Sequence, residues 1–307
     1  MTHFFKKILI FSAVLSILTI IPTIFINYFA NPYGLFGGFS NNYKTEPNQR
    51  SLKNWYILEN KDKYQNLFFS DSRGGTFVFS DSTYYNMSYS LGVPFQFHQD
   101  IKAILNNGIK IKSVIIMIDE YSIFEEAEKH INQPLRKKFN RNDLTSFFSI
   151  PLSRTKIYSI LSFNKFDKHI TFNVSSDGSY EYNNFTINNR VDTLKTKISV
   201  LPPTYKTQQV FYDIEECVNY LRSKKIAVQI GVHPISKGNY INNINKFEQL
   251  NSLINMLNNS DINLFNELVI IDDKNLNSIF YDASHYGPNL AKEVINNLKD
   301  SVNNSKP

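Results

Sequence analysis

The stretch Gln65-Asn-Leu-Phe-Phe-Ser-Asp-Ser-Arg-Gly-Gly75 decides the fold, because it joins a short apolar run to a turn that contains glycine. The apolar run at 65–69 predicts a buried strand, and the glycines predict a tight turn from this strand into a helix. Comparable apolar runs follow at residues 84–87, 113–118, 226–232 and 268–271. Helical spacing is found at residues 95–105, 212–223 and 289–298, and a further helix is expected around Trp55. This alternation predicts an α/β domain whose parallel sheet is covered by helices.

A long segment from about residue 125 to 207 interrupts the alternation of strands and helices. It is rich in aromatic residues and asparagine, as in Tyr180-Glu-Tyr-Asn-Asn-Phe185. We interpret this segment as an insertion or cap within an α/β domain that spans residues 64–307. Its aromatic side chains would suit stacking against sugar rings.

The composition indicates a folded chain without a nucleic-acid partner. Of 307 residues, 42% are hydrophobic and 20% are charged, which is enough apolar surface for one large domain. The net charge of +6 comes from lysines spread along the chain, and no nucleic-acid-binding motif organises them. Cys217 is the only cysteine, which excludes an intrachain disulfide and a multi-cysteine metal site.

The N-terminus carries an uncharged run at residues 8–30, preceded by Lys6 and Lys7. About 20 residues of apolar helix cross a bilayer, and no small-x-small cleavage site ends the run, so we expect an uncleaved transmembrane anchor and not a signal peptide. The alternative is a buried helix of a soluble protein. The positive-inside rule places residues 1–7 in the cytoplasm. We therefore expect a single-pass protein of the cell membrane, with a juxtamembrane segment at 31–63 and an extracytoplasmic main domain.

Residues suited to acyl-group chemistry follow the first predicted strand and precede the last predicted helix. Ser72 lies in the glycine-containing turn, where its hydroxyl would be exposed near backbone N–H groups. Asp282 and His285 lie together in Tyr281-Asp-Ala-Ser-His-Tyr-Gly287. A serine becomes nucleophilic when a base removes its proton, and a carboxylate orients that base. We predict that Ser72 is the nucleophile, His285 the base and Asp282 the orienting carboxylate.

Two other residues compete for roles in this site. Ser82 is a rival nucleophile because the text Phe-Ser-Asp-Ser occurs at both 69–72 and 79–82, but only Ser72 has a preceding strand and following glycines. His233 follows the predicted strand at 226–232, where it could line the substrate cleft or simply cap the strand end.

Metal and cofactor chemistry has little support in the sequence. Asp119 and Glu120 end the third predicted strand and could form a carboxylate pair for glycosidic or metal chemistry, but no second acidic cluster matches them. The chain contains no Walker, Gly-x-Gly-x-x-Gly or His-Glu-x-x-His motif. We therefore predict no metal and no cofactor.

The order of these motifs resembles the SGNH, or GDSL-like, superfamily of esterases and acyltransferases, in which an early Gly-Asp-Ser block is followed by a late Asp-x-x-His block. The anchor, the Ser-Asp-Ser-Arg text at 70–73 and the Tyr-Asn-Met-Ser text at 85–88 resemble membrane-anchored members. Those members include the D-alanyl transfer proteins of teichoic acid modification and the alginate O-acetylation proteins. The resemblance covers roughly residues 64–300 and implies a flavodoxin-like, three-layer α/β/α domain.

The chain departs from this superfamily mainly in the residues that would stabilise an oxyanion. Ser70 replaces the usual glycine of the first block. Ser88 stands near the expected second-block glycine, with Gly92 as an alternative N–H donor, and Arg73 is a further candidate for substrate contact. The third-block asparagine has no clear match at 119–122. Loss of one oxyanion donor commonly lowers the rate by about 100-fold to 1,000-fold.

The resemblance implies an extracytoplasmic O-acyltransferase, acting with an acetyl group on a cell-envelope polysaccharide or related polymer through an acyl-enzyme on Ser72. Because acyl-CoA is cytoplasmic, it also implies a multipass membrane acyltransferase as partner. One alternative is an esterase that uses the same triad and lets water resolve the intermediate. Another is a non-catalytic envelope protein that binds glycan or an assembly partner, since fold alone does not prove activity.

Overall fold

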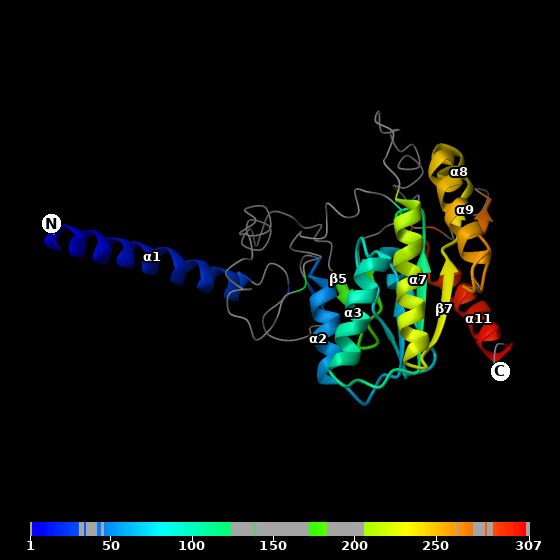
Figure 1. Cartoon of the computed structure of the whole chain (residues 1–307), viewed down its shortest axis with the longest axis horizontal. Coiled ribbons are helices and arrows are strands. Elements are labelled where there is room, and N and C mark those ends of the chain that lie inside the picture. Colours follow the sequence, from blue (N-terminus) through cyan, green and yellow to red (C-terminus); the bar gives the residue numbers. More distant parts are fainter. Residues whose placement is uncertain are drawn as a thin grey trace.

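The computed structural model describes residues 2–30, 34, 42–43, 46–123, 138, 172–182, 206–262, 264–272, 280 and 285–304. Its elements, drawn in Figure 1, are α1 (Thr2–Ala30), β1 (Asn42–Tyr43), α2 (Gln49–Glu59), β2 (Asn66–Phe69), the 3-10 helix η1 (Ser72–Thr76), β3 (Tyr84–Asn86), α3 (Pro94–Asn106), β4 (Ser113–Ile118), β5 (Phe172–Val174), β6 (Tyr180–Tyr182), α7 (Thr207–Ser223), β7 (Ala227–Val232), β8 (Ile235–Ser236), α8 (Lys237–Asn242), α9 (Ile244–Asn258), β9 (Ile270–Ile271) and α11 (Pro288–Asn304).

The central sheet is parallel, as predicted, with the strand order β3-β2-β4-β7. Leu67 of β2 pairs with Tyr85 on one side and with Val114 on the other. Beyond β7 a parallel bridge joins Ile230 to Leu264 and continues the sheet at that edge. The strand order therefore reverses next to β2, and the carboxyl ends of β2 and β4 open onto the same edge, where α/β folds place their ligands.

The strand predicted at 268–271 lies outside the central sheet in which it was expected. The run at 268–271 forms only the short strand β9, which pairs with β8 and not with the central sheet. Pro234 lies between β7 and β8. Because proline has no N–H to donate, it interrupts a ladder at this point.

Side chains of the central strands alternate between two hydrophobic clusters, one on each face of the sheet. Leu67 and Phe69 of β2 belong to the first cluster, and Phe68 belongs to the second. The first cluster includes residues of α2, α3, α7 and α9, whereas α11 supplies the helical part of the second. Figure 1 shows α2, α3 and α7 side by side over one face. The domain thus has three layers, α/β/α, and a register shift by one residue would exchange the two faces of β2.

The expected helix around Trp55 is confirmed as α2, and it is embedded in the domain. Arg50 forms a buried ion pair with Asp100 of α3, with an Nε–Oδ2 distance of 2.8 Å. The described part of the expected insertion includes the antiparallel hairpin β5–β6, whose strand β5 pairs antiparallel with β1. Other residues of the insertion, including most of 124–171 and all of 183–205, lie outside the described residues.

The N-terminal run forms the helix α1, which lies apart from the α/β domain in Figure 1. Its large apolar side chains from Phe4 to Leu18 are exposed, and side chains from residue 19 to 30 lie outside the described residues. Over the part of the chain that is described, no helix is long and apolar enough to cross a membrane. The prediction that residues 8–30 are helical is therefore confirmed, and the membrane span stays a prediction.

Candidate active site

A short 3-10 helix presents Ser72 directly after β2. Asp71 caps this helix, since its Oδ1 accepts a hydrogen bond of 2.9 Å from the Arg73 N–H. Both glycines of the turn are needed for close approach: a Cβ on Gly74 would lie 2.4 Å from the Cβ of Ser70, and one on Gly75 would lie 2.2 Å from the Tyr180 ring. Ser72 itself is half-buried, so its hydroxyl is within reach of a substrate.

The structure brings Ser72 together with His285, as predicted. The Ser72 Oγ lies 2.8 Å from the His285 Nε2, and His285 is also half-buried in the segment before α11. This is the distance at which an imidazole can take the hydroxyl proton of a nucleophile. Asp282, the predicted orienting carboxylate, lies outside the described residues. Ser82 is exposed in the turn before β3, so the hydrogen bond to the histidine distinguishes Ser72 from its rival.

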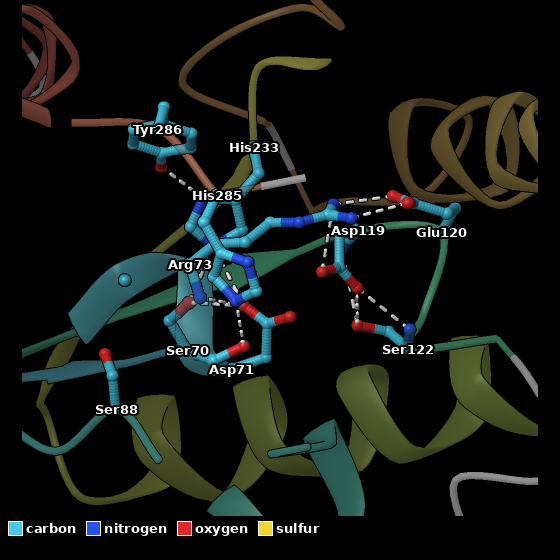
Figure 2. Close-up of polar contacts among 12 residues, drawn as sticks. Ser70, Asp71, Arg73, Ser88, Asp119, Glu120, Ser122, His233, His285 and Tyr286 are labelled. Carbon is cyan, nitrogen blue, oxygen red and sulfur yellow. Dashed lines mark hydrogen bonds and ion pairs between the residues drawn. The ribbon is translucent and has the colours of Figure 1, made fainter. Parts of the chain in front are cut away.

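His233 is fully buried and does not line a cleft, contrary to one of the two interpretations from sequence. Its Nε2 lies 2.6 Å from the Ser70 Oγ, and its Nδ1 lies 2.5 Å from the Tyr286 hydroxyl (Figure 2). Burial lowers the pKa of His233 to about 3, although the nearby Asp119 carboxylate opposes this shift. The imidazole is therefore neutral in the folded protein near neutral pH.

Arg73, a candidate for substrate contact from the sequence, is buried in an ion cluster beside the serine turn. Its two terminal nitrogens bind both oxygens of Glu120, at 2.6 and 2.5 Å, and Nη1 also lies 3.1 Å from the Asp119 Oδ2 (Figure 2). Burial opposes the charge of Arg73, but Glu120 and Asp119 outweigh it and raise the Arg73 pKa. Arg73 thus links the turn after β2 to the residues after β4, and its contact with substrate stays a prediction.

The two acidic residues after β4, Asp119 and Glu120, are likewise buried. Burial would raise the pKa of Asp119, but Arg73 outweighs it and lowers this pKa to about 2. Burial first, and the Asp119 charge second, raise the pKa of Asp71 well above its usual value, which favours a protonated Asp71 that hydrogen bonds to Asp119. Among the described residues, no group of histidine, cysteine and acidic side chains is arranged to hold a metal ion.

Both oxyanion candidates named from the sequence already use their backbone N–H groups. The Ser88 N–H donates to the Asn86 Oδ1 at 2.9 Å, and the Gly92 N–H donates to the Tyr89 carbonyl at 3.0 Å. By contrast, the Ser72 N–H has no acceptor among the described residues and stands at the start of η1, where N–H groups are unpaired. It is the better candidate for an oxyanion donor.

Asn86 is a site residue that sequence reasoning missed. Its Nδ2 donates to the carbonyls of Gly74 at 2.8 Å and Phe77 at 3.0 Å, and its Oδ1 accepts from Ser88. The amide therefore fixes the serine turn to the end of β3. The signals in the sequence are that Asn86 is a polar residue near the end of the predicted strand at 84–87 and that it belongs to the Tyr-Asn-Met-Ser text at 85–88.

The inserted hairpin also reaches the serine turn. The Tyr180 hydroxyl donates to the Ser72 carbonyl at 3.3 Å, and its ring packs against Gly75. Beneath this ring the Lys53 Nζ lies 4.7 Å from the ring centroid and donates to the Ser88 carbonyl. Lys53 is fully buried, and burial lowers its pKa well below the usual value. Residues of α2 and of the insertion thus support the turn from below.

No protein-family model and no curated protein matches the chain. Its function must therefore be inferred from the residues of the site.

Proposed function

We propose that the protein is an SGNH-type O-acyltransferase that uses Ser72 as a transient acyl carrier. The observation that carries this proposal is the 2.8 Å contact between the Ser72 Oγ and the His285 Nε2, formed by two half-buried side chains at the carboxyl edge of a parallel sheet. The strand order of the sheet, with the serine directly after β2, supports an SGNH-like assignment of the domain.

The proposed reaction has two steps that share the same base. In the first, the Ser72 Oγ attacks the donor carbonyl while its proton passes to the His285 Nε2, and the Ser72 N–H donates to the developing oxyanion. The tetrahedral intermediate collapses, the leaving group takes the proton from His285, and an acyl ester remains on Ser72. In the second step an acceptor hydroxyl gives its proton to His285 and attacks this ester, and His285 passes the proton to the Ser72 Oγ as the bond between Ser72 and the acyl group breaks. Asp282 is proposed to orient the His285 imidazole.

The acceptor is proposed to be a cell-envelope polysaccharide or related polymer outside the cytoplasm. The support is the helix α1, whose large apolar side chains from Phe4 to Leu18 are exposed. Lys6 and Lys7, in its second turn, directly precede the uncharged run at 8–30. Such a helix would hold the domain at the membrane surface, where a multipass membrane acyltransferase could supply the acyl group. In this proposal α1 is a membrane anchor and the domain works together with the multipass acyltransferase.

Hydrolysis of the same intermediate is the second candidate. Ser72 and His285 are each half-exposed, so water has access to the ester unless an acceptor displaces it. A third candidate, a binding protein without catalysis, is favoured by the engaged N–H groups of Ser88 and Gly92, which leave the oxyanion site with few donors.

Acetyl transfer from an activated ester to an oligosaccharide separates these candidates. The full chain should acetylate sugar hydroxyls, and Ser72→Ala should lower the rate by about 1,000-fold or more. Ser82→Ala is the matched control, because it removes an exposed serine from the same Phe-Ser-Asp-Ser text and should keep the rate. Free acetate without acetylated sugar would indicate the esterase, and no turnover by the folded chain would indicate the binding protein.

A further inference from the structure

A single buried imidazole joins the two chain segments that carry the proposed nucleophile and base. His233 bonds through Nε2 to Ser70, which lies just before Ser72, and through Nδ1 to Tyr286, which directly follows His285. The three residues of this bridge are fully buried. Neither Ser70 nor Tyr286 belongs to the proposed reaction, yet each is within two positions of a residue that does.

The bridge is rigid because its members pack as well as bond. The ring of Phe77 meets His233 edge-on at a centroid distance of 6.1 Å and meets Tyr286 at 6.0 Å. On the other side, the Ser70 side chain fills the space in which a Cβ on Gly74 would collide. A shift of His233 would therefore be transmitted to the turn that holds Ser72 and to the loop that holds His285.

The electrostatic surroundings keep this imidazole neutral. The ionisable groups that face it are Asp71, whose Oδ1 lies 3.8 Å from the His233 Nε2, and Asp119, Arg73, His285 and the bonded Tyr286. A neutral imidazole has one donor and one acceptor nitrogen, and serine and tyrosine hydroxyls can each serve as either partner. The bridge can thus be fully satisfied without a charge, which suits a permanent structural link.

We propose that His233 is a positioning residue that sets the distance and alignment between Ser72 and His285 by bonding Ser70 with one nitrogen and Tyr286 with the other. The proposal rests on the proposed function for its catalytic consequence, but the geometric claim stands on the hydrogen bonds. His233 touches neither substrate nor the reacting atoms in this scheme.

The test compares acylation of Ser72 in the full chain by an activated acetyl ester, with binding and chemical steps measured separately. His233→Leu should lower the limiting acylation rate by about 10-fold to 100-fold with little change in the concentration for half-saturation, because a misplacement of about 1 Å can cost a factor of about 100. His233→Gln, which keeps a donor and an acceptor, should restore part of the rate. The matched control is His98→Leu, which removes another buried histidine, one on α3 that lies against Glu216 and Tyr220 of α7, and should leave the rate unchanged.

Imidazole ¹⁵N NMR of the same proteins gives a readout that needs no turnover. In the wild type the His285 Nε2 signal should report a hydrogen bond to Ser72, and His233→Leu should remove it while His98→Leu does not. If the wild type is never acylated, the proposed function fails, and the NMR comparison alone decides the positioning claim. An unchanged His285 signal and rate in His233→Leu, or equal losses in His98→Leu, would overturn it.

Discussion

Replacement of Arg73 by methionine tests how much the buried ion cluster beside Ser72 contributes to the stability of the fold. The guanidinium is buried and holds two carboxylates, at 2.5 and 2.6 Å for Glu120 and 3.1 Å for Asp119. Methionine keeps much of the side-chain length but leaves Glu120 and Asp119 buried without a counterion. Removal of one partner from a buried ion pair costs about 3–5 kcal/mol, and a folded domain has only about 5–15 kcal/mol in total.

The loss should depend on pH in a direction that identifies its cause. Without Arg73, the folded-state pKa of Asp119, now about 2, should rise above the unfolded value. The folded variant then binds more protons than the unfolded chain in mildly acidic solution, so the free energy of unfolding rises as the pH falls. The difference between wild type and Arg73→Met should therefore shrink from pH 7 to pH 5.

Urea denaturation can follow this difference through Trp55, the single tryptophan of the chain, which is buried in α2. The double variant Arg73→Met with Glu120→Met is the control, because it removes a buried carboxylate along with its partner and should recover part of the loss. A loss below about 1 kcal/mol at pH 7 for the single variant, or a loss that does not shrink at pH 5, would refute the reasoning.

Three further predictions concern single contacts. Unfolded histidine takes up a proton near pH 6.5, whereas His233 in the folded protein does so only at about 3. Between pH 7 and pH 5 the free energy of unfolding of the wild type, measured in urea, should therefore fall by about 2 kcal/mol more than that of His233→Gln. Parallel pH profiles of the two proteins would contradict this. Gly75→Ala should lower the free energy of unfolding by about 1–3 kcal/mol, since its Cβ would lie 2.2 Å from the Tyr180 ring. Tyr180→Leu in the same chain should relieve this clash, so additive losses in the melting temperatures of the two variants would contradict the explanation. Asn86→Leu should cost about 2–4 kcal/mol in urea, because the Phe77 carbonyl and the Ser88 N–H lose the hydrogen bonds that Asn86 makes to them, and Ser72 acylation should slow by about 10-fold; an unchanged rate would show that the amide does not hold the turn.

The central strands could be predicted from the sequence because both of their faces are buried. The run at 113–118 is apolar at nearly every position, and it coincides with β4. The helix predicted at 212–223 begins earlier, at Thr207, because its first turn is polar and gives no apolar periodicity. The run at 268–271 is equally strand-like, but its partner is set by the chain path after Pro234, which local sequence does not encode.

The site was predictable only where position along the chain implies proximity. Ser72 and His285 were found because one follows the first strand and the other precedes the last helix, and both ends meet at one edge of the sheet. The ion pair of Arg73 with Glu120 could not be predicted, since Glu120 follows β4 and only the strand order makes the two residues neighbours. Nothing in the sequence around Lys53 indicates that its amine is buried under the ring of Tyr180.

Reaction of the full chain with an activated acetyl ester, followed by intact-mass analysis and peptide mapping, tests the central claim most directly. We predict one acetyl adduct on the peptide that contains Ser72, absent from Ser72→Ala, strongly reduced in His285→Ala and retained in Ser82→Ala. An adduct that persists in folded Ser72→Ala, or no adduct on the folded wild type, would contradict the claim that His285 activates Ser72.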